Sequence, residues 1–135
     1  MADTSTNYGW AIPVEDSDPW YAAFLSLINE IDAELFAGLI RSTTVNAAAY
    51  STVAGDYLID IPHTTVEPVT ITIDSDNVIL GAILRILDSG GNASANNITI
   101  VTEGAETISG EPSWIIDNDY NCVLLWCNGT NWFVI

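Results

Sequence analysis

The feature that most constrains this chain is a series of short apolar runs, separated by turn residues, that fills residues 43–135. The breaks between the runs are rich in Gly, Asn, Asp and Ser, as in "AGD", "DSGGN" and "NGTN". Runs such as "VTITI" and "NITIV" alternate apolar and polar positions and are rich in β-branched residues, which favours strands. The pattern predicts a mainly β domain, expected to be an antiparallel β-sandwich or jelly roll preceded by one N-terminal α-helix.

Each apolar run is expected to form one strand of this domain. The predicted strands cover residues 45–52, 57–61, 69–74, 82–88, 97–102, 113–117, 122–127 and 132–135. The last two are expected to form a hairpin, because Asn128-Gly129 suits a two-residue type I′ turn. Cys122 and Cys127 fall on opposite faces of one predicted strand, about 17 Å apart, which is too far for a disulfide. Both are interpreted as buried small hydrophobic residues.

The N-terminal part divides into a polar leader and one predicted helix. Residues 1–16 are interpreted as an attachment segment, whose apolar side chains dock either on this chain or on a neighbouring subunit. Residues 17–42 are predicted to be the helix, because Ser17 or Asp18 can cap it and Pro19 suits its first position. The leader's attachment residues are Tyr8, Trp10 and Ile12, and the helix carries a heptad-like seam of Tyr21, Phe24, Ile28, Ile31 and Leu35. The seam suits either a coiled coil or a helix packed on a sheet.

The charge of the chain is strongly one-sided, with 18 acidic residues against two arginines and a net charge of −16. Nucleic acid and anionic membrane surfaces are excluded as partners, because both require clustered Lys and Arg. The acidity suits either a soluble surface or life in molar salt, and the absence of lysine favours the second. A secretory signal is not expected, and acidic residues interrupt the apolar segment 19–40, which argues against a membrane span.

Residues capable of catalysis are sparse. The one histidine, His63, follows a proline and is interpreted as a surface turn residue rather than a general base. Carboxylate pairs occur at Asp56/Asp60, Asp74/Asp76 and Asp117/Asp119, in turns where Asp serves to cap the backbone. Two of these turns offer oxygen ligands for calcium but lack the full spaced ligand set. We therefore predict no enzyme activity, no cofactor and no metal site. Glycosylation at the sequons of Asn92, Asn97 and Asn128 stays open.

The closing strands "CVLLWC" and "NWFVI" are apolar on both faces, unlike the strands of a monomeric antiparallel sandwich. Such strands need a second layer of cover, supplied either by the helix or by other subunits, and we expect subunits. The predicted oligomer core consists of Ile28, Ile31, Ile98, Ile100, Val123, Leu125, Trp132 and Val134, with burial falling on these side chains or on their opposite-face neighbours.

Two stretches carry a resemblance. "LGAILRILDSGGNASANNITIVTEGAETISG…NCVLLWCNGTNWFVI" resembles a β-domain frequent in tailed-phage virion proteins, and "YSTVAGDYLIDI…VTITI" resembles its opening strands. The leader "TNYGWAIP…DPW…INEID" is similar to segments that attach tail fibres or head appendages to a virion. Because such domains commonly form intertwined homotrimers, the resemblance implies a homotrimer in contact with other virion proteins, located in the virion.

The chain lacks the long shaft or large tip of fibre proteins, so a head-decoration, spike-base or adaptor role is expected, and the acidity suits a virus of halophilic archaea. One alternative is a tip that binds a host receptor or carbohydrate, which predicts an exposed Trp114 near Asp117 and Asp119. The other is a secreted β-sandwich binding module outside any virion.

Overall fold

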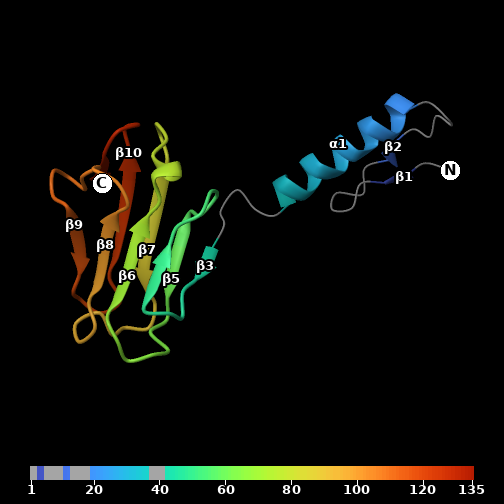
Figure 1. Ribbon diagram of the computed structural model, residues 1–135. Helices are drawn as coiled ribbons and strands as arrows, with labels where there is room; N and C mark the ends of the chain where they lie inside the picture. The colour runs from blue at the N-terminus through green and yellow to red at the C-terminus, as the bar shows by residue number, and fades with distance from the viewer. Residues whose placement is uncertain (1–2, 5–10, 13–18, 37–41) are drawn as a thin grey trace. The chain divides into compact units, whose positions relative to one another are not determined.

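The computed structural model describes residues 3–4, 11–12, 19–36 and 42–135 of the chain (Figure 1). Two compact units divide the chain, residues 1–39 and residues 40–135. In the first unit, β1 (Asp3–Thr4) pairs antiparallel with β2 (Ala11–Ile12), and α1 (Pro19–Phe36) follows. The helix begins at the proline, where the missing N–H is not needed.

One side of α1 is apolar and open to solvent within its unit. Phe24, Leu27 and Ile31 are each close to half exposed, while Ile28 is half-buried. These residues recur every three or four positions, so they share one face of the helix. The described part of the chain contains no helix with the length and apolarity needed to cross a membrane.

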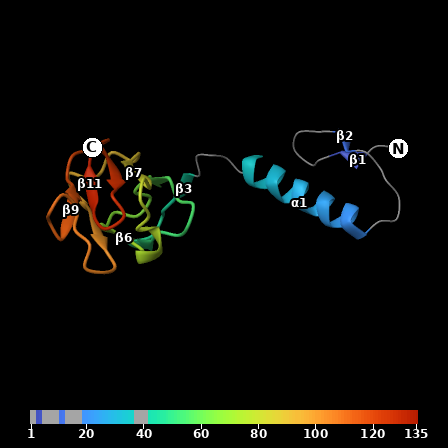
Figure 2. The same ribbon diagram turned by 90° about the horizontal axis from the view of Figure 1, so that it is seen from above.

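The second unit is built from nine strands, all within the described residues 42–135, in two sheets that face each other (Figures 1 and 2). The strands are β3 (Ser42–Thr44), β4 (Ala49–Ser51), β5 (Leu58–Ile61), β6 (Val69–Ile73), β7 (Ile83–Asp88), β8 (Ile98–Thr102), β9 (Ser113–Ile116), β10 (Cys122–Cys127) and β11 (Trp132–Val134). A short 3-10 helix, η1 (Ser75–Asn77), follows β6. One sheet has the order β11-β10-β7-β5-β3 and the other β4-β6-β8-β9.

The sheets are mixed, so the expectation of an antiparallel sandwich or jelly roll is wrong in its topology, although the mainly β class is confirmed. Successive strands from β3 to β8 alternate between the two sheets. As a result β3, β5 and β7 run parallel in one sheet, and β4, β6 and β8 run parallel in the other. The chain therefore winds as a coil in which each turn adds one strand to each sheet. The last strands, β9, β10 and β11, close the coil with antiparallel pairing.

The core lies between the sheets and is filled mainly by isoleucine. Alternate residues of each strand point inward, as the burial patterns of β6 and β7 show. The fully buried side chains of the core include Ile59, Ile61, Ile71, Ile73, Ile86, Ile98, Ile100, Ile108, Leu125 and Trp132. β-branched side chains suit this role because they lose little rotamer freedom on a pleated surface.

Burial corrects part of the predicted oligomer core. Ile98, Ile100, Val123, Leu125 and Trp132 are at most 4 % exposed within one chain. Val134 is half-buried and packs against the same cluster. These side chains cannot form a contact surface between subunits, because the opposite sheet of the same chain already covers them. The sequence correctly indicated that these side chains are apolar. It assigned them to a contact between subunits, whereas they belong to the core of one chain.

The closing hairpin is present, but its turn differs from the prediction. Trp132 pairs with Cys127, so the loop contains four residues, 128–131, and the Asn128 N–H donates to the Asn131 carbonyl at 3.0 Å. Gly129 has φ +90°, whereas Asn128 is not among the residues with positive φ, as a type I′ turn would require. The Asn128 side-chain oxygen instead accepts the N–H groups of Thr130 and Asn131.

Candidate functional site

The outer faces of the two sheets differ sharply in chemistry. The register of the four-stranded sheet places mainly small hydroxyl side chains on its outer face, together with Ala49, Val101 and Ile115. The hydroxyl residues are Ser51, Thr70, Thr72, Thr99 and Ser113. This composition is ordinary for a sheet face in contact with water.

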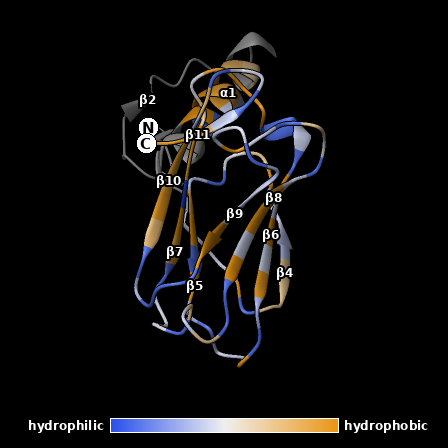
Figure 3. Ribbon diagram, turned by 90° about the vertical axis from the view of Figure 1, so that its left-hand side faces the viewer, coloured by the Kyte–Doolittle hydropathy of each residue, from blue (hydrophilic) through white to orange (hydrophobic). Residues whose placement is uncertain are grey.

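The outer face of the five-stranded sheet is apolar at its centre and toward β11. The strand register aligns its side chains in three rows. The rows are Phe133–Trp126–Ile83, Ile135–Leu124–Arg85–Leu58–Ser42, and Cys122–Leu87–Asp60–Thr44. We call this set of twelve residues the outer apolar face. In Figure 3, β10 is coloured hydrophobic along most of its length, whereas β6 and β8 alternate. A face of this kind on a protein surface typically marks an interaction site.

Aromatic side chains mark one end of the outer apolar face. The rings of Trp126 and Phe133 lie with centroids 5.9 Å apart and tilted by 40°. Both residues are half-buried, and the neighbouring Ile135 is 66 % exposed. Aromatic residues with part of their surface open to solvent are enriched at protein interfaces.

Two opposite charges interrupt the apolar rows. Arg85 is exposed, and its guanidinium lies 4.0 Å from the Cys122 sulfur. Asp60 is half-buried on the adjacent strand β5, in the row next to that of Arg85. Cys127 is buried as expected, but Cys122 is exposed on the outer apolar face, which corrects the prediction that both cysteines are buried.

The other residues predicted to make interactions lie in different parts of the chain. Trp114 faces inward opposite Ile100 and packs against the core, so it does not stand exposed beside the turn carboxylates as a receptor tip would require. Tyr8 and Trp10 lie outside the described residues, and only the backbone of Ile12 is described, in β2. For Ile28 and Ile31 of α1, a role in an oligomer core stays a prediction.

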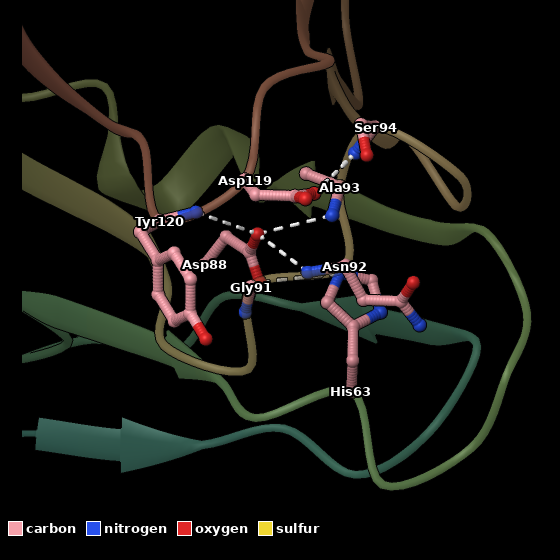
Figure 4. A network of polar contacts seen from close by, with 8 residues as sticks. All are labelled: His63, Asp88, Gly91, Asn92, Ala93, Ser94, Asp119 and Tyr120. Carbon is pink, nitrogen blue, oxygen red and sulfur yellow. Dashed lines mark hydrogen bonds and ion pairs between the residues drawn. The ribbon is translucent and has the colours of Figure 1, made fainter.

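A buried carboxylate, Asp88 at the end of β7, organises the "DSGGNAS" loop (Figure 4). One of its oxygens accepts the Gly91 N–H at 3.0 Å. The other accepts the N–H groups of Asn92, Ala93 and Tyr120 at 3.0, 3.0 and 3.1 Å. Four backbone donors surrounding one carboxylate form the kind of cradle that binds anions in other proteins, and here the chain fills it with its own side chain.

His63 belongs to the same cluster, which corrects the interpretation of this residue as a surface turn residue. Its side chain is 1 % exposed, and Nε2 lies 3.6 Å from the nearer Asp88 oxygen (Figure 4). Neither ring nitrogen makes a hydrogen bond within the described residues. A histidine beside a carboxylate supplies two members of a Ser-His-Asp triad, but the Ser94 side chain does not point toward the imidazole (Figure 4).

The cluster joins three loops that lie far apart in the sequence. His63 follows β5, Asp88 begins the loop before β8, and Tyr120 precedes β10. His63 and Tyr120 both have positive φ, +48° and +58°, which non-glycine residues rarely adopt. A Cβ added to Gly90 would lie 2.1 Å from the Pro62 carbonyl oxygen, so only glycine fits there. Strained residues held by such contacts indicate a rigid junction between loops.

Among the carboxylates of the predicted pairs, Asp56, Asp74 and Asp119 accept backbone N–H groups as expected. Asp60 lies within β5 rather than in a turn, which corrects its placement. The Asp119 side chain accepts the Ser94 N–H at 2.8 Å, and this bond is the main reason that the pKa of Asp119 lies below its ordinary value, with a further contribution from His63. Asp74 accepts the Asp76 N–H at the start of η1. Asp56 accepts hydrogen bonds from Thr43, Tyr50 and Val53. In the described ranges, no three His, Cys, Asp or Glu side chains are grouped so as to hold a metal ion.

Comparison with known proteins adds no identification. No family model matches the chain, and no curated protein matches it in sequence.

Proposed function

We propose that this protein is a structural component of a tailed-virus particle, of the head-decoration, spike or tail-fibre type, that assembles as a homotrimer. The virion role rests on the resemblance of the "LGAILRILDSGGN…NWFVI" region to β-domains of tailed-phage proteins. The trimer rests on that resemblance and on the apolar surface of the β-domain. The protein acts by association, with no chemical step.

The observation that carries the assembly proposal is the contrast between the two outer sheet faces. Hydroxyl side chains form most of the outer face of the four-stranded sheet, while eight of the twelve residues on the outer apolar face are hydrophobic. Burying such side chains in a contact is favourable by about 25 cal/mol per Å² of apolar surface. The inward-facing side chains are already buried in the core, so the outer apolar face is the surface of the β-domain left for assembly.

Light scattering coupled to size exclusion tests the proposal, with the full chain in low and high salt. We expect the mass of three copies for the native protein. Leu124→Asp places a charge in the centre of the outer apolar face and should release monomers. Thr99→Asp adds the same charge to the outer face of the other sheet and serves as the matched control, which should leave the trimer intact.

A native chain that is monomeric in every salt concentration would contradict the proposal. So would a trimer that survives Leu124→Asp but dissociates with Thr99→Asp. For the virion role, mass spectrometry of purified particles is expected to detect the chain in a fixed ratio to the major particle protein. Its absence from the particles would leave the assembly proposal standing and overturn the virion role.

A further inference from the structure

Arg85 poses a physical problem for any partner that covers the outer apolar face. It lies in the middle row, flanked by Leu124 on one strand and Leu58 on the other. Among the described residues it makes no ion pair, and its one hydrogen-bond contact is with the Cys122 sulfur at 4.0 Å. A purely apolar partner would bury this guanidinium without a counter-charge, which costs more free energy than the apolar contact contributes.

The same face carries the complementary group. The Asp60 carboxylate is half-buried among Leu87 and Thr44, its direct neighbours in the third row. Within the described part of the chain it accepts no hydrogen bond and joins no ion pair. Asp60 and Arg85 lie in neighbouring rows on adjacent strands and form no ion pair with each other, so each can pair with a group brought by a partner.

We propose that the occupant of the outer apolar face is the same face of a second copy, with Arg85 of one copy paired to Asp60 of the next. This inference rests on the proposed homotrimer and deepens it by naming the contact. In a closed ring of three, each copy gives its arginine to one neighbour and its aspartate to the other, so every charge is neutralised. The apolar rows around the pair exclude water, which strengthens the attraction and sets the register.

The composition of the chain makes the outer apolar face the place where two copies can attract each other through opposite charges. With only two arginines and no lysine per copy, contacts between copies of this acidic chain offer few places for an attractive charge pair. Arg85 is the one arginine in the described ranges, and the chain has no lysine. The outer apolar face supplies both members of the pair. A face that carries both members of the pair needs no second protein to satisfy them in a head-to-tail ring.

A charge-swap experiment on the full chain tests the pairing, with trimer dissociation followed by analytical ultracentrifugation over a dilution series. Arg85→Asp and Asp60→Arg should each raise the dissociation constant by about tenfold or more, the range measured for close charge pairs at interfaces. The double variant restores opposite charges and should return to within about threefold of the native value. Circular dichroism of each variant checks that the β-domain remains folded.

Asp117→Arg is the matched control, because it makes the same charge change as Asp60→Arg in an exposed turn outside the face. It reduces the net negative charge and should leave assembly unchanged or slightly strengthen it. If Arg85→Asp weakens the trimer and the double variant with Asp60→Arg does not restore it, Arg85 pairs with another carboxylate. That result would overturn the pairing with Asp60. A trimer that responds to Leu124→Asp but to neither charge reversal would overturn the pairing alone, whereas a monomeric native chain would overturn both proposals.

Discussion

Asp88 satisfies four backbone N–H groups with one carboxylate that has no contact with solvent. Hydrogen bonds from backbone donors to a charged acceptor are stronger than those between neutral groups, and unpaired buried donors are costly. The loop from Gly91 to Ala93 therefore depends on this single side chain. An aspartate that looks like one more turn residue in the sequence is the polar centre of three loops.

Asp88→Asn should destabilise the protein by about 3 kcal/mol, because the amide NH₂ group would face backbone donors and leave them unpaired. Urea unfolding followed by tryptophan fluorescence measures the change. Asp76→Asn, which alters an exposed carboxylate in η1, is the control and should change stability by less than about 0.5 kcal/mol. Equal effects of the two substitutions would contradict the structural role of Asp88.

Asp119 makes the stability of the folded chain depend on pH under acidic conditions. Its pKa is lower in the folded chain than in the unfolded chain, chiefly because it accepts the Ser94 N–H. The stabilisation by Asp119 is therefore present at pH values above its pKa in the unfolded chain. It is lost as the pH falls through its pKa in the folded chain. Thermal unfolding between pH 6 and pH 2 should show a smaller acid loss for Asp119→Asn than for the native chain. An unchanged pH profile would contradict this assignment.

At the scale of elements, glycine rather than a side chain brings the β5–β6 and β7–β8 loops together. The backbone of Gly90 approaches the Pro62 carbonyl so closely that no Cβ can be accommodated. The Gly90 N–H also donates to the Ile61 carbonyl at 3.2 Å. This contact joins successive turns of the coil at the ends of their strands, where the core no longer holds them.

Gly90→Ala should cost about 1–3 kcal/mol, because the added methyl group meets backbone that has to shift. Gly104→Ala is the control, since its Cβ would meet only the carboxylate end of the flexible Glu106 side chain, which can move away. We expect that control to stay within about 0.5 kcal/mol of the native chain. The difference between the two midpoints of urea unfolding reports the loop contact, and a difference near zero would contradict it.

The sequence predicted the strands of the β-domain better than their partners. Alternation is a local property, so β5 to β11 fall within a residue or two of the predicted ranges. The short strand β3 was missed because the predicted helical segment extended to residue 42. Parallel pairing was missed because short turns suggest hairpins, whereas here each turn crosses to the opposite sheet, which allows a parallel sheet with short connections.

The sites show the same division between local and long-range information. The capping roles of Asp56 and Asp74 follow from their own loops and were predicted. The burial of His63 depends on Asp88, which lies 25 positions later and reaches it only through the coil. The two apolar faces of β10 were visible in the sequence, but which face is internal depends on the register with β7.

At the scale of the whole molecule, two opposing effects decide whether copies associate. The outer apolar face favours contact, while a net charge of −16 on each copy opposes it. Salt screens the repulsion between whole chains, but it also weakens the proposed pair between Arg85 and Asp60. Sixteen excess charges per copy act against one pair per contact, so the net effect of added salt should be stronger association.

The dissociation constant of the proposed trimer should therefore be lower in 1 M KCl than in 0.01 M KCl, as measured by analytical ultracentrifugation. The Debye length falls from about 30 Å to about 3 Å over this range, so the repulsion is largely removed. Sucrose at matched osmolality favours buried surface without screening charge, and it should give a much smaller change. Association that weakens steadily with added salt would mean that local ion pairs outweigh the net charge, and would contradict adaptation of this surface to high salt.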